Sequence, residues 1–163
     1  MEKVRATSDI DGVAHDCAGR LDALYRAEYS GMVRLAYTLV GNNAEAEELV
    51  QDSFVAIYRR LDEIRQPGAY LRSTVVSRCR SALRRRRVMS LLPPEPPVGL
   101  PGGAGELWDV LAKLSEDQRI AVVLRYYGRY RASEIAKIVD MPAATVRSHI
   151  RRGLATLRKE LEQ

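Results

Sequence analysis

Four carboxylates lie close together in the sequence and are the first candidates for chemistry: Glu45, Glu47, Glu48 and Asp52. Such groups catalyse proton transfer or bind a metal when a histidine or a second carboxylate cluster converges on them, and the sequence offers neither. His15 with Cys17 is too small a set for a zinc site. Glycine-rich phosphate loops and nucleophile elbows are also missing from the sequence. We therefore expect no enzyme activity, no metal and no cofactor.

A second set of residues suits DNA. A short helix predicted over 132–139 is followed by the turn Asp140-Met141-Pro142 and a longer helix over 143–161, a pattern typical of a helix-turn-helix. Val146 and Ile150 are expected to pack inward. The outward positions combine small residues, which permit close approach, with arginines, which reach bases or phosphates: Ala143, Ala144, Thr145, Arg147, Ser148, Arg151 and Arg152. An αα-hairpin with a solvated basic face is the plainer alternative.

A basic run, Arg84-Arg85-Arg86-Arg87, ends another predicted helix that also carries Arg78 and Arg80. Together these residues extend a surface suited to nucleic acid. Tyr70 and Ser77 add stacking and hydrogen-bonding groups of the kind that bind single-stranded bases. Basic tetrads are also often simply solvated, and a helical tyrosine often belongs to a core, so both interpretations stay open.

The elements that position these residues are predicted to be helices throughout. Apolar positions recur with helical spacing over 21–39, which fits one or two helices, and over 43–61, 69–86, 107–115 and 116–127. Asn43 is expected to cap the second of these segments, and Ser115 with Gln118 forms a capping box. Residues 91–105 hold five of the seven prolines and four glycines, which predicts a linker. The fold class is therefore all-α, with two small helical domains.

Charge is unevenly distributed along the 163 residues, whose formal net charge is +5. Residues 1–58 carry 5 basic and 10 acidic side chains, residues 59–87 carry 10 and 2, and residues 88–163 carry 11 and 9. This indicates an acidic face, a basic face and a mixed module. No apolar run approaches the roughly 18 residues that span a bilayer, and the N-terminus has no apolar signal core. We expect a cytoplasmic protein without membrane insertion.

Several of these segments resemble the extracytoplasmic-function sigma factors of bacteria, with the actinobacterial sigma-E subfamily as the pattern matched. Residues 44–54, AEAEELVQDSF, resemble the family signature DAEDLVQETF. Residues 114–119, LSEDQR, and 123–127, VLRYY, resemble LPERQRxVLxLRYY, while 134–136 and 145–148 resemble the helix-turn-helix signature. The resemblance implies a domain division into an N-terminal extension (1–19), region 2 (20–90), a linker (91–105) and region 4 (106–163).

The resemblance also implies roles. A family member binds core RNA polymerase and promoter DNA, is associated with the nucleoid when in holoenzyme, and is often held by an anti-sigma factor; no small-molecule substrate is implied. Core polymerase contact falls on Glu48, Gln51, Asp52 and Phe54. Contact with the −10 element, including a base-capturing loop over 76–81, falls on Tyr70, Ser77, Arg78, Arg80, Ser81, Arg84 and Arg85. Contact with the −35 element falls on Thr145, Arg147, Ser148, His149, Arg151 and Arg152.

Two other functions remain compatible with the sequence itself. A stand-alone helix-turn-helix regulator would bind its operator tightly without polymerase, and its N-terminal module would sense a ligand or dimerise. An interaction protein would occupy polymerase or an anti-sigma factor without initiating transcription. The extension at 1–19 is expected either to be disordered or to regulate, since chain termini are often disordered.

Overall fold

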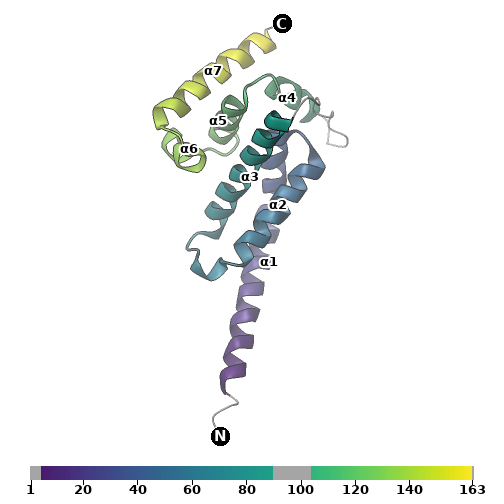
Figure 1. Ribbon diagram of the computed structural model, residues 1–163, viewed down its shortest axis with the longest axis vertical. Helices are drawn as coiled ribbons and strands as arrows, with labels where there is room; N and C mark the ends of the chain where they lie inside the picture. The colour runs from purple at the N-terminus through teal and green to yellow at the C-terminus, as the bar shows by residue number, and fades with distance from the viewer. Residues whose placement is uncertain (1–4, 90–103, 163) are drawn as a thin grey trace.

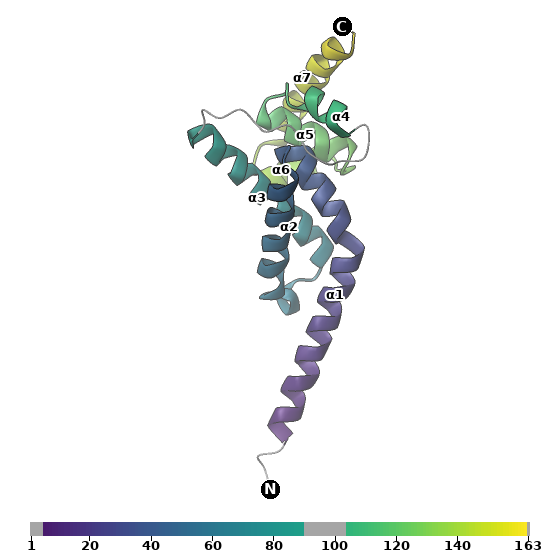
Figure 2. The same cartoon turned by 90° about the vertical axis from the view of Figure 1, so that its right-hand side faces the viewer.

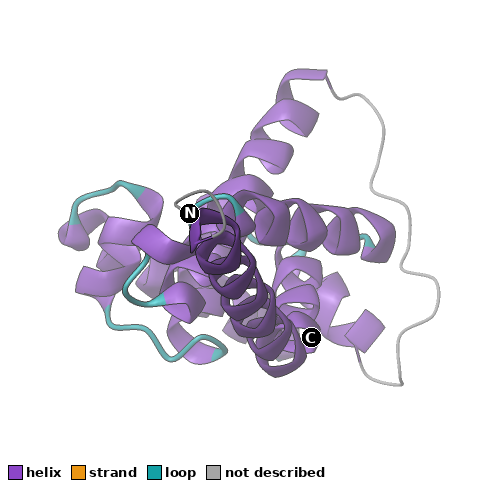
Figure 3. Ribbon diagram, turned by 90° about the horizontal axis from the view of Figure 1, so that it is seen from below, coloured by secondary structure: helices purple, strands orange, loops and turns teal. Residues whose placement is uncertain are grey.

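The computed structural model describes residues 5–89 and 104–162 and confirms an all-helical fold in that part of the chain (Figure 1). Helices and short turns are the only elements drawn for these residues (Figure 3). An N-terminal module comprises α1 (Arg5–Val40), α2 (Asn43–Tyr58), the 3₁₀ turn η1 (Leu61–Glu63) and α3 (Pro67–Met89). A C-terminal module comprises α4 (Ala104–Leu111), α5 (Glu116–Tyr126), α6 (Ala132–Val139) and α7 (Ala143–Leu161).

The first helix is longer than expected. It begins at Arg5 rather than near Leu21, so residues 5–19 of the expected N-terminal extension are helical, whereas residues 1–4 lie outside the described part. Its N-terminal half projects beyond the other helices in both side views (Figures 1 and 2). The predicted linker falls mostly outside the described residues, and α4 begins at Ala104, just before the predicted end of that linker.

The turn between α1 and α2 fixes where the second helix starts. Gly41 adopts a φ of 74°, a left-handed conformation that glycine tolerates best, and its N–H donates to the Tyr37 carbonyl at 2.8 Å. The side chain of Asn42 accepts the Glu45 N–H at 2.9 Å and caps α2. The prediction of Asn43 as the cap was therefore wrong by one residue. Asn43 is the first helical residue instead.

The C-terminal module follows the predicted pattern closely. The capping box of Ser115 and Gln118 is present at the start of α5. Asp140 ends α6 with a φ of 51°, and a tight turn leads into α7. Pro142 lies at the N-cap position with a φ of −59°, and Ala143 is the first helical residue of α7, as the predicted helix over 143–161 requires. The helix-turn-helix predicted from sequence is thus confirmed in its elements.

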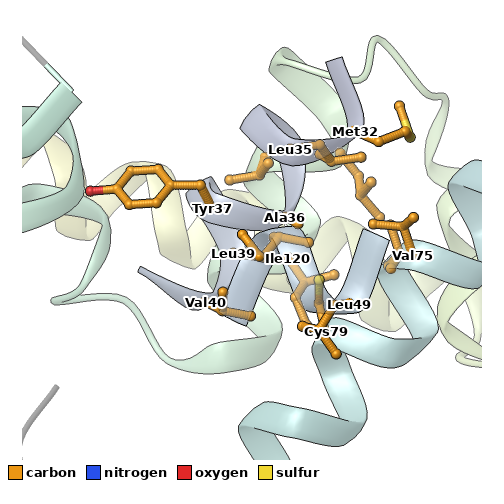
Figure 4. Close-up of a cluster of buried hydrophobic side chains, with 14 of the residues drawn as sticks. Met32, Leu35, Ala36, Tyr37, Leu39, Val40, Leu49, Val75, Cys79 and Ile120 are labelled. Carbon is orange, nitrogen blue, oxygen red and sulfur yellow. The ribbon is translucent and has the colours of Figure 1, made fainter. Parts of the chain in front are cut away.

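One hydrophobic core runs through both modules. In the N-terminal module the expected inward stripe of α2 is buried: Ala46, Leu49, Val50, Phe54 and Ile57, with Leu61 following in η1. Ile120 of α5 lies among side chains of α1 and α3, close to Leu39 and Cys79 (Figure 4). The modules are therefore packed against each other, with α5 on α1 and α6 on α3.

Two apolar residues of the C-terminal module are exposed. Leu107 and Tyr127 lie within the predicted helical segments 107–115 and 116–127, where apolar positions recur with helical spacing, yet they are 57% and 50% exposed. Both lie beside a groove between the modules, where neighbouring helices do not close over them. No helix in the described residues is long and apolar enough to cross a membrane.

Candidate nucleic-acid and protein interfaces

The start of α7 presents the residues predicted to contact duplex DNA. Arg147, Arg151 and Arg152 are exposed. Thr145, Ser148 and His149 are partly buried beside them, while Val146 is buried as predicted. An exposed basic start to a helix that follows a tight turn is suited to entering a DNA groove.

Gly153 sets how closely α7 lies on α5. This glycine is buried, and a Cβ at its position would lie only 2.8 Å from Cγ2 of Val122. A helical glycine costs stability relative to alanine, but it allows the two helix axes to approach. Helix α7, which carries the residues predicted to contact DNA, is therefore packed closely against α5.

A basic cleft of about 790 Å³ runs along α7, and we call it the arginine cleft. Its apolar floor includes Ile150 and Leu154, and none of its lining residues is acidic. Its basic residues come from α5, the start of α6 and α7: Arg125, Arg131, Arg147, Arg151 and Arg158. Such a cleft attracts phosphates, because arginine forks match phosphate oxygens.

Sequence reasoning missed three members of the arginine cleft, Arg125, Arg131 and Arg158. The guanidinium of Arg125 donates to the Tyr130 carbonyl at 3.1 Å, which holds its position beside the turn. The missed residues lie on different elements, so only the folded module brings them together. For Arg158 the sequence held one signal, the lack of acids between Met141 and Lys159, whereas Arg125 and Arg131 lie outside that stretch.

The exposed face of α2 carries three of the four residues expected to contact core polymerase. Glu48, Gln51 and Asp52 are exposed, and the structure adds Val55 and Tyr58, which are 55% and 51% exposed on the same helix. Their spacing of three to four residues places all five on one side of α2. Exposed apolar side chains flanked by polar ones are typical of a protein-binding surface.

Phe54, the fourth residue expected at that contact, does not belong to this surface. It is only 6% exposed, and its ring centroid lies 5.1 Å from that of Tyr25 and 6.2 Å from that of Tyr29. The apolar spacing over 43–61 also places Phe54 on the inward stripe of α2, and its burial there gives no support to the direct contact that the resemblance implies, because the ring fills the α1–α2 interface. Phe54 positions α2 against α1.

The base-capturing loop expected over 76–81 is also absent, since these residues lie inside the continuous helix α3. Val76 and Cys79 are buried against the core. The helix continues through 76–81 because no proline or glycine interrupts 69–89 and because its apolar stripe is buried from Leu71 to Leu83. Four of the expected −10 residues remain exposed on α3: Ser77, Ser81, Arg84 and Arg85.

The other three expected −10 residues make contacts within the protein. Arg78 pairs with Asp52 at 3.5 Å. The hydroxyl of Tyr70 accepts a hydrogen bond from Arg60 at 3.3 Å. Arg80 donates to the Val139 carbonyl and lies 3.9 Å from a carboxylate oxygen of Asp117, so the C-terminal module covers it.

The basic tetrad is divided between structure and surface. Arg86 donates to the Val40 carbonyl at 2.8 Å and pairs with Glu45, while Arg84, Arg85 and Arg87 are exposed. Burial lowers the pKa of the Arg86 guanidinium. The Val40 carbonyl ends α1, where a cation also suits the helix dipole. Arg86 therefore ties three helices together.

The acidic cluster of the sequence does not converge into a site. Glu45 turns toward Arg86, and Glu47 accepts from the Asn43 amide at 2.9 Å. Within residues 5–89 and 104–162 there is no group of three His, Cys, Asp or Glu residues that could hold a metal ion. Burial raises the pKa of the Cys79 thiol to about 12, which leaves it unreactive near neutral pH.

A second concavity of about 790 Å³ lies between the modules, with α1 on one side and α4, α5 and α7 on the other. We call it the intermodule groove. Its walls are mainly apolar and aromatic and include Tyr29, Val33, Tyr37, Leu111, Tyr126 and Leu157. Because both modules supply walls, the groove has this shape only while they are packed together.

Comparison with known proteins gives two family matches. Residues 24–88 match Sigma-70 region 2, and residues 104–157 match Sigma-70, region 4. The chain is 32% identical to the RNA polymerase sigma-E factor of Streptomyces avermitilis, over 92% of this chain and 89% of that protein. It is 25% identical to the ECF RNA polymerase sigma factor SigW of Bacillus subtilis, over 78% and 81% of the two chains.

Two solved structures share the fold. One is the sigma factor RpoE in complex with the anti-sigma factor NepR from Bartonella quintana, with a TM-score of 0.68, 21% identity, and coverage of 90% of this chain and 97% of that one. The other is CnrH in complex with the cytosolic domain of CnrY, with a TM-score of 0.64, 20% identity, and coverage of 91% and 94%.

Proposed function

Because the chain belongs to the extracytoplasmic-function sigma factors of the sigma-70 family, which direct RNA polymerase to promoters, we propose how three of its surfaces divide that work. The α2 face contacts core polymerase, the exposed side of α3 contacts the −10 element, and α7 with the arginine cleft contacts the −35 element. Membership of this non-catalytic family excludes the two alternative functions, a stand-alone regulator and an interaction protein that does not initiate transcription.

The arginine cleft is the observation that carries the proposal most strongly. Five guanidinium groups line one cleft beside the start of α7, and no acidic residue belongs to its lining. Arg147 and Arg151 lie on the recognition helix and suit base edges, whereas Arg125 and Arg131 lie on the supporting elements and suit phosphates. One module thus offers both the contacts that position DNA and those that read its sequence.

The α2 face supports the polymerase assignment through its mixed chemistry. Val55 and Tyr58 provide apolar area, and Glu48 and Asp52 provide negative charge at its edge. An apolar centre with a charged rim is the usual anatomy of a protein interface. The α2 face therefore suits a basic protein surface. Its carboxylates would repel the phosphates of DNA.

The exposed side of α3 supports the −10 assignment. Ser77 and Ser81 lie four residues apart and can donate hydrogen bonds, and Arg84 follows on the same side of the helix. Such a row contacts a single strand through its backbone and base edges. Arg78 and Arg80 complete this surface when they leave their partners in the protein.

The intermodule groove supports an anti-sigma factor as a further partner. Its aromatic walls suit the apolar face of a helix, and the two related folds above were each solved with a bound partner, which in one of them is an anti-sigma factor. An anti-sigma segment in this groove contacts both modules at once. The protein acts in the cytoplasm and, as part of holoenzyme, at the nucleoid.

Transcription with purified core polymerase on a genomic template library tests the proposal. We expect promoter-dependent transcripts whose start sites share −10 and −35 elements. Replacing Arg147 and Arg151 with alanine should abolish them, whereas Lys159→Ala, a matched loss of one exposed charge on α7, should not. Absence of any promoter-dependent transcript would contradict the proposal, as would tight sequence-specific binding to duplex DNA without polymerase.

A further inference from the structure

The intermodule groove has the size and the lining of a small-molecule site. Its volume of about 790 Å³ lies within the range of roughly 300–1,000 Å³ that is usual for ligand pockets, which are mostly apolar and often lie between domains. Leu107, Tyr126 and Tyr127 of its C-terminal wall are 57%, 58% and 50% exposed. Apolar side chains that gather in a concave surface and remain open to water favour an apolar ligand.

Trp108 gives this wall a fixed shape. The indole lines the groove but is only 5% exposed, and it leaves no room for a Cβ on Gly41 in the α1–α2 turn. The guanidinium of Arg119 in α5 lies 4.8 Å from the centroid of its ring. Because the turn and α5 both hold the indole, the wall is formed before a ligand arrives, which limits the entropy that binding costs.

Arg34 of α1 is the one charged residue among the described residues that line the groove. Its side chain is exposed, and no carboxylate among the described side chains pairs with it. Ser30, about one turn earlier on α1, adds a hydroxyl group to the same wall. An arginine and a hydroxyl group in an apolar groove suit a carboxylate, which accepts two parallel hydrogen bonds from a guanidinium.

The aromatic walls raise the alternative of a cationic ligand, because tyrosine and tryptophan rings attract cations over their faces. The described lining of the groove contains no carboxylate, however, and its charge is that of Arg34. A cation in the groove would be repelled by this guanidinium and would find no counter-ion in the lining, whereas an anion gains a partner. The charge of the lining therefore favours an anionic ligand over a cationic one.

Tyr37 supplies a second polar group on the α1 wall. Its side chain is only 6% exposed, its ring points away from the other labelled core residues (Figure 4), and its hydroxyl has no hydrogen-bond partner among the described residues. Burial is the main cause that raises the pKa of this phenol, and the Asp109 carboxylate adds to the rise. The hydroxyl therefore keeps its proton near neutral pH and is a donor for which a ligand oxygen is a suitable acceptor.

We propose that the intermodule groove binds a small apolar molecule that ends in one carboxylate, of the fatty-acid or aryl-acid kind. The apolar body lies between the aromatic walls, and the carboxylate pairs with Arg34. The inference touches the proposed function in one respect, because such a ligand excludes the anti-sigma segment that is assigned to the same groove. Binding of the ligand itself depends on the groove alone, so it can be measured without polymerase or promoter DNA.

Trp108 reports binding, because it lines the groove and is the one tryptophan of the chain. The aliphatic probes are decanoate, decanol and decyltrimethylammonium, and the aromatic probes are biphenylacetate and its amide. We expect at least one carboxylate to change the Trp108 fluorescence saturably and to raise the midpoint of thermal unfolding. It should bind about threefold to tenfold more tightly than its uncharged counterpart, and the cation should bind most weakly. The tighter of the two carboxylates identifies the ligand as a fatty acid or an aryl acid.

Three variants of α1 test the assignment of residues. Arg34→Gln should weaken binding of the carboxylates by about threefold to tenfold and leave binding of decanol and the amide unchanged. Arg26→Gln, a matched loss of an exposed arginine on α1 outside the groove, should change no affinity. Val33→Phe adds a ring to the α1 wall and should weaken binding of every probe by about tenfold. Thermal unfolding of each variant without ligand confirms that it is folded.

The outcomes separate the inference from the proposed function. The lack of a saturable response to either carboxylate would overturn the inference, as would tightest binding of the cation. Equal losses for carboxylates and uncharged probes in the Arg34→Gln chain would overturn the pairing with Arg34. Failure of promoter-dependent transcription by a chain that still binds a carboxylate would instead refute the proposed function and leave the inference standing.

Discussion

Helices α3 and α7 are both rich in arginine, but they use it differently. Four arginines of α3 contact other parts of the protein: Arg72, Arg78, Arg80 and Arg86. Arg147, Arg151 and Arg158 of α7 instead line an open cleft without an acidic neighbour. A count of charges therefore does not measure the charge available to a ligand. Packing decides which arginines stabilise the fold and which remain for DNA.

The largest difference should appear when α7 loses its cleft arginines. Replacing both Arg147 and Arg151 with alanine should weaken binding of holoenzyme to −35 duplex by about 1–3 kcal/mol for each base contact. The free energy of unfolding should change by less than about 0.5 kcal/mol for each substitution, because both side chains are exposed. Fluorescence anisotropy and urea unfolding measure the two quantities. Equal losses in the free energy of DNA binding and in the free energy of unfolding would indicate misfolding.

On α3, by contrast, loss of an arginine that contacts other helices should lower the stability of the protein. Arg86→Ala removes the partner of the Val40 carbonyl and of Glu45, and should lower the free energy of unfolding by about 1–2 kcal/mol. Arg85→Ala, on the exposed side of the same helix, should stay within about 0.5 kcal/mol. Urea denaturation of both variants makes the comparison. If the Arg85 variant were the less stable, the division of α3 into internal and free arginines would be wrong.

A smaller effect, on the affinity for core polymerase, should distinguish the α2 face from the arginine-rich helices α3 and α7. Asp52→Arg reverses a charge on the proposed polymerase contact, and should weaken core binding by about 1 kcal/mol while leaving −35 binding by the free chain unchanged. Asp109→Arg, an exposed reversal in the C-terminal module, serves as the control. Titration of labelled chain with core enzyme gives the affinities. Matching losses in the two variants would point to a general electrostatic effect.

The smallest expected effect concerns the roles within the arginine cleft. Arg125→Ala should reduce the slope of log K against log salt for DNA binding by about 1 and should weaken all sequences alike. Arg147→Ala should instead relax the preference for one base position. Binding assays at several salt concentrations on a set of single-base variants resolve the two patterns. A base-specific loss in the Arg125 variant would contradict its assignment to phosphate.

Local signals in the sequence predicted most of the fold. Helical spacing, the Ser115 capping box and the turn at Asp140 each depend on a few neighbouring residues, and the structure contains all three. The N-cap of α2 was displaced by one residue, which is the usual uncertainty of helix ends.

The predictions that failed concern residues whose surroundings depend on contacts between distant segments of the chain. Phe54 lies in the segment that resembles the family's polymerase contact, but its ring meets Tyr25 and Tyr29 of α1. Arg80 belongs to a basic run but lies under α6, and the expected loop at 76–81 is helical because Val76, Cys79 and the apolar residues on either side pack into the core. Only the packing of the two modules reveals these contacts. The same holds for Arg125 and Arg131, which join α7 in space alone.

The close approach at Gly153 also determines how far the recognition helix protrudes. Because α7 lies on Val122 with no side chain between them, the helix stands at a fixed height above its support. A methyl group added at Gly153 would lie 2.8 Å from Cγ2 of Val122, so α7 and α5 could not keep their present spacing without a shift at this contact. Arginine forks read base edges within narrow tolerances of distance and angle. Gly153, which is not one of the proposed DNA contacts, thus sets how far α7 extends toward the −35 element in the proposed complex.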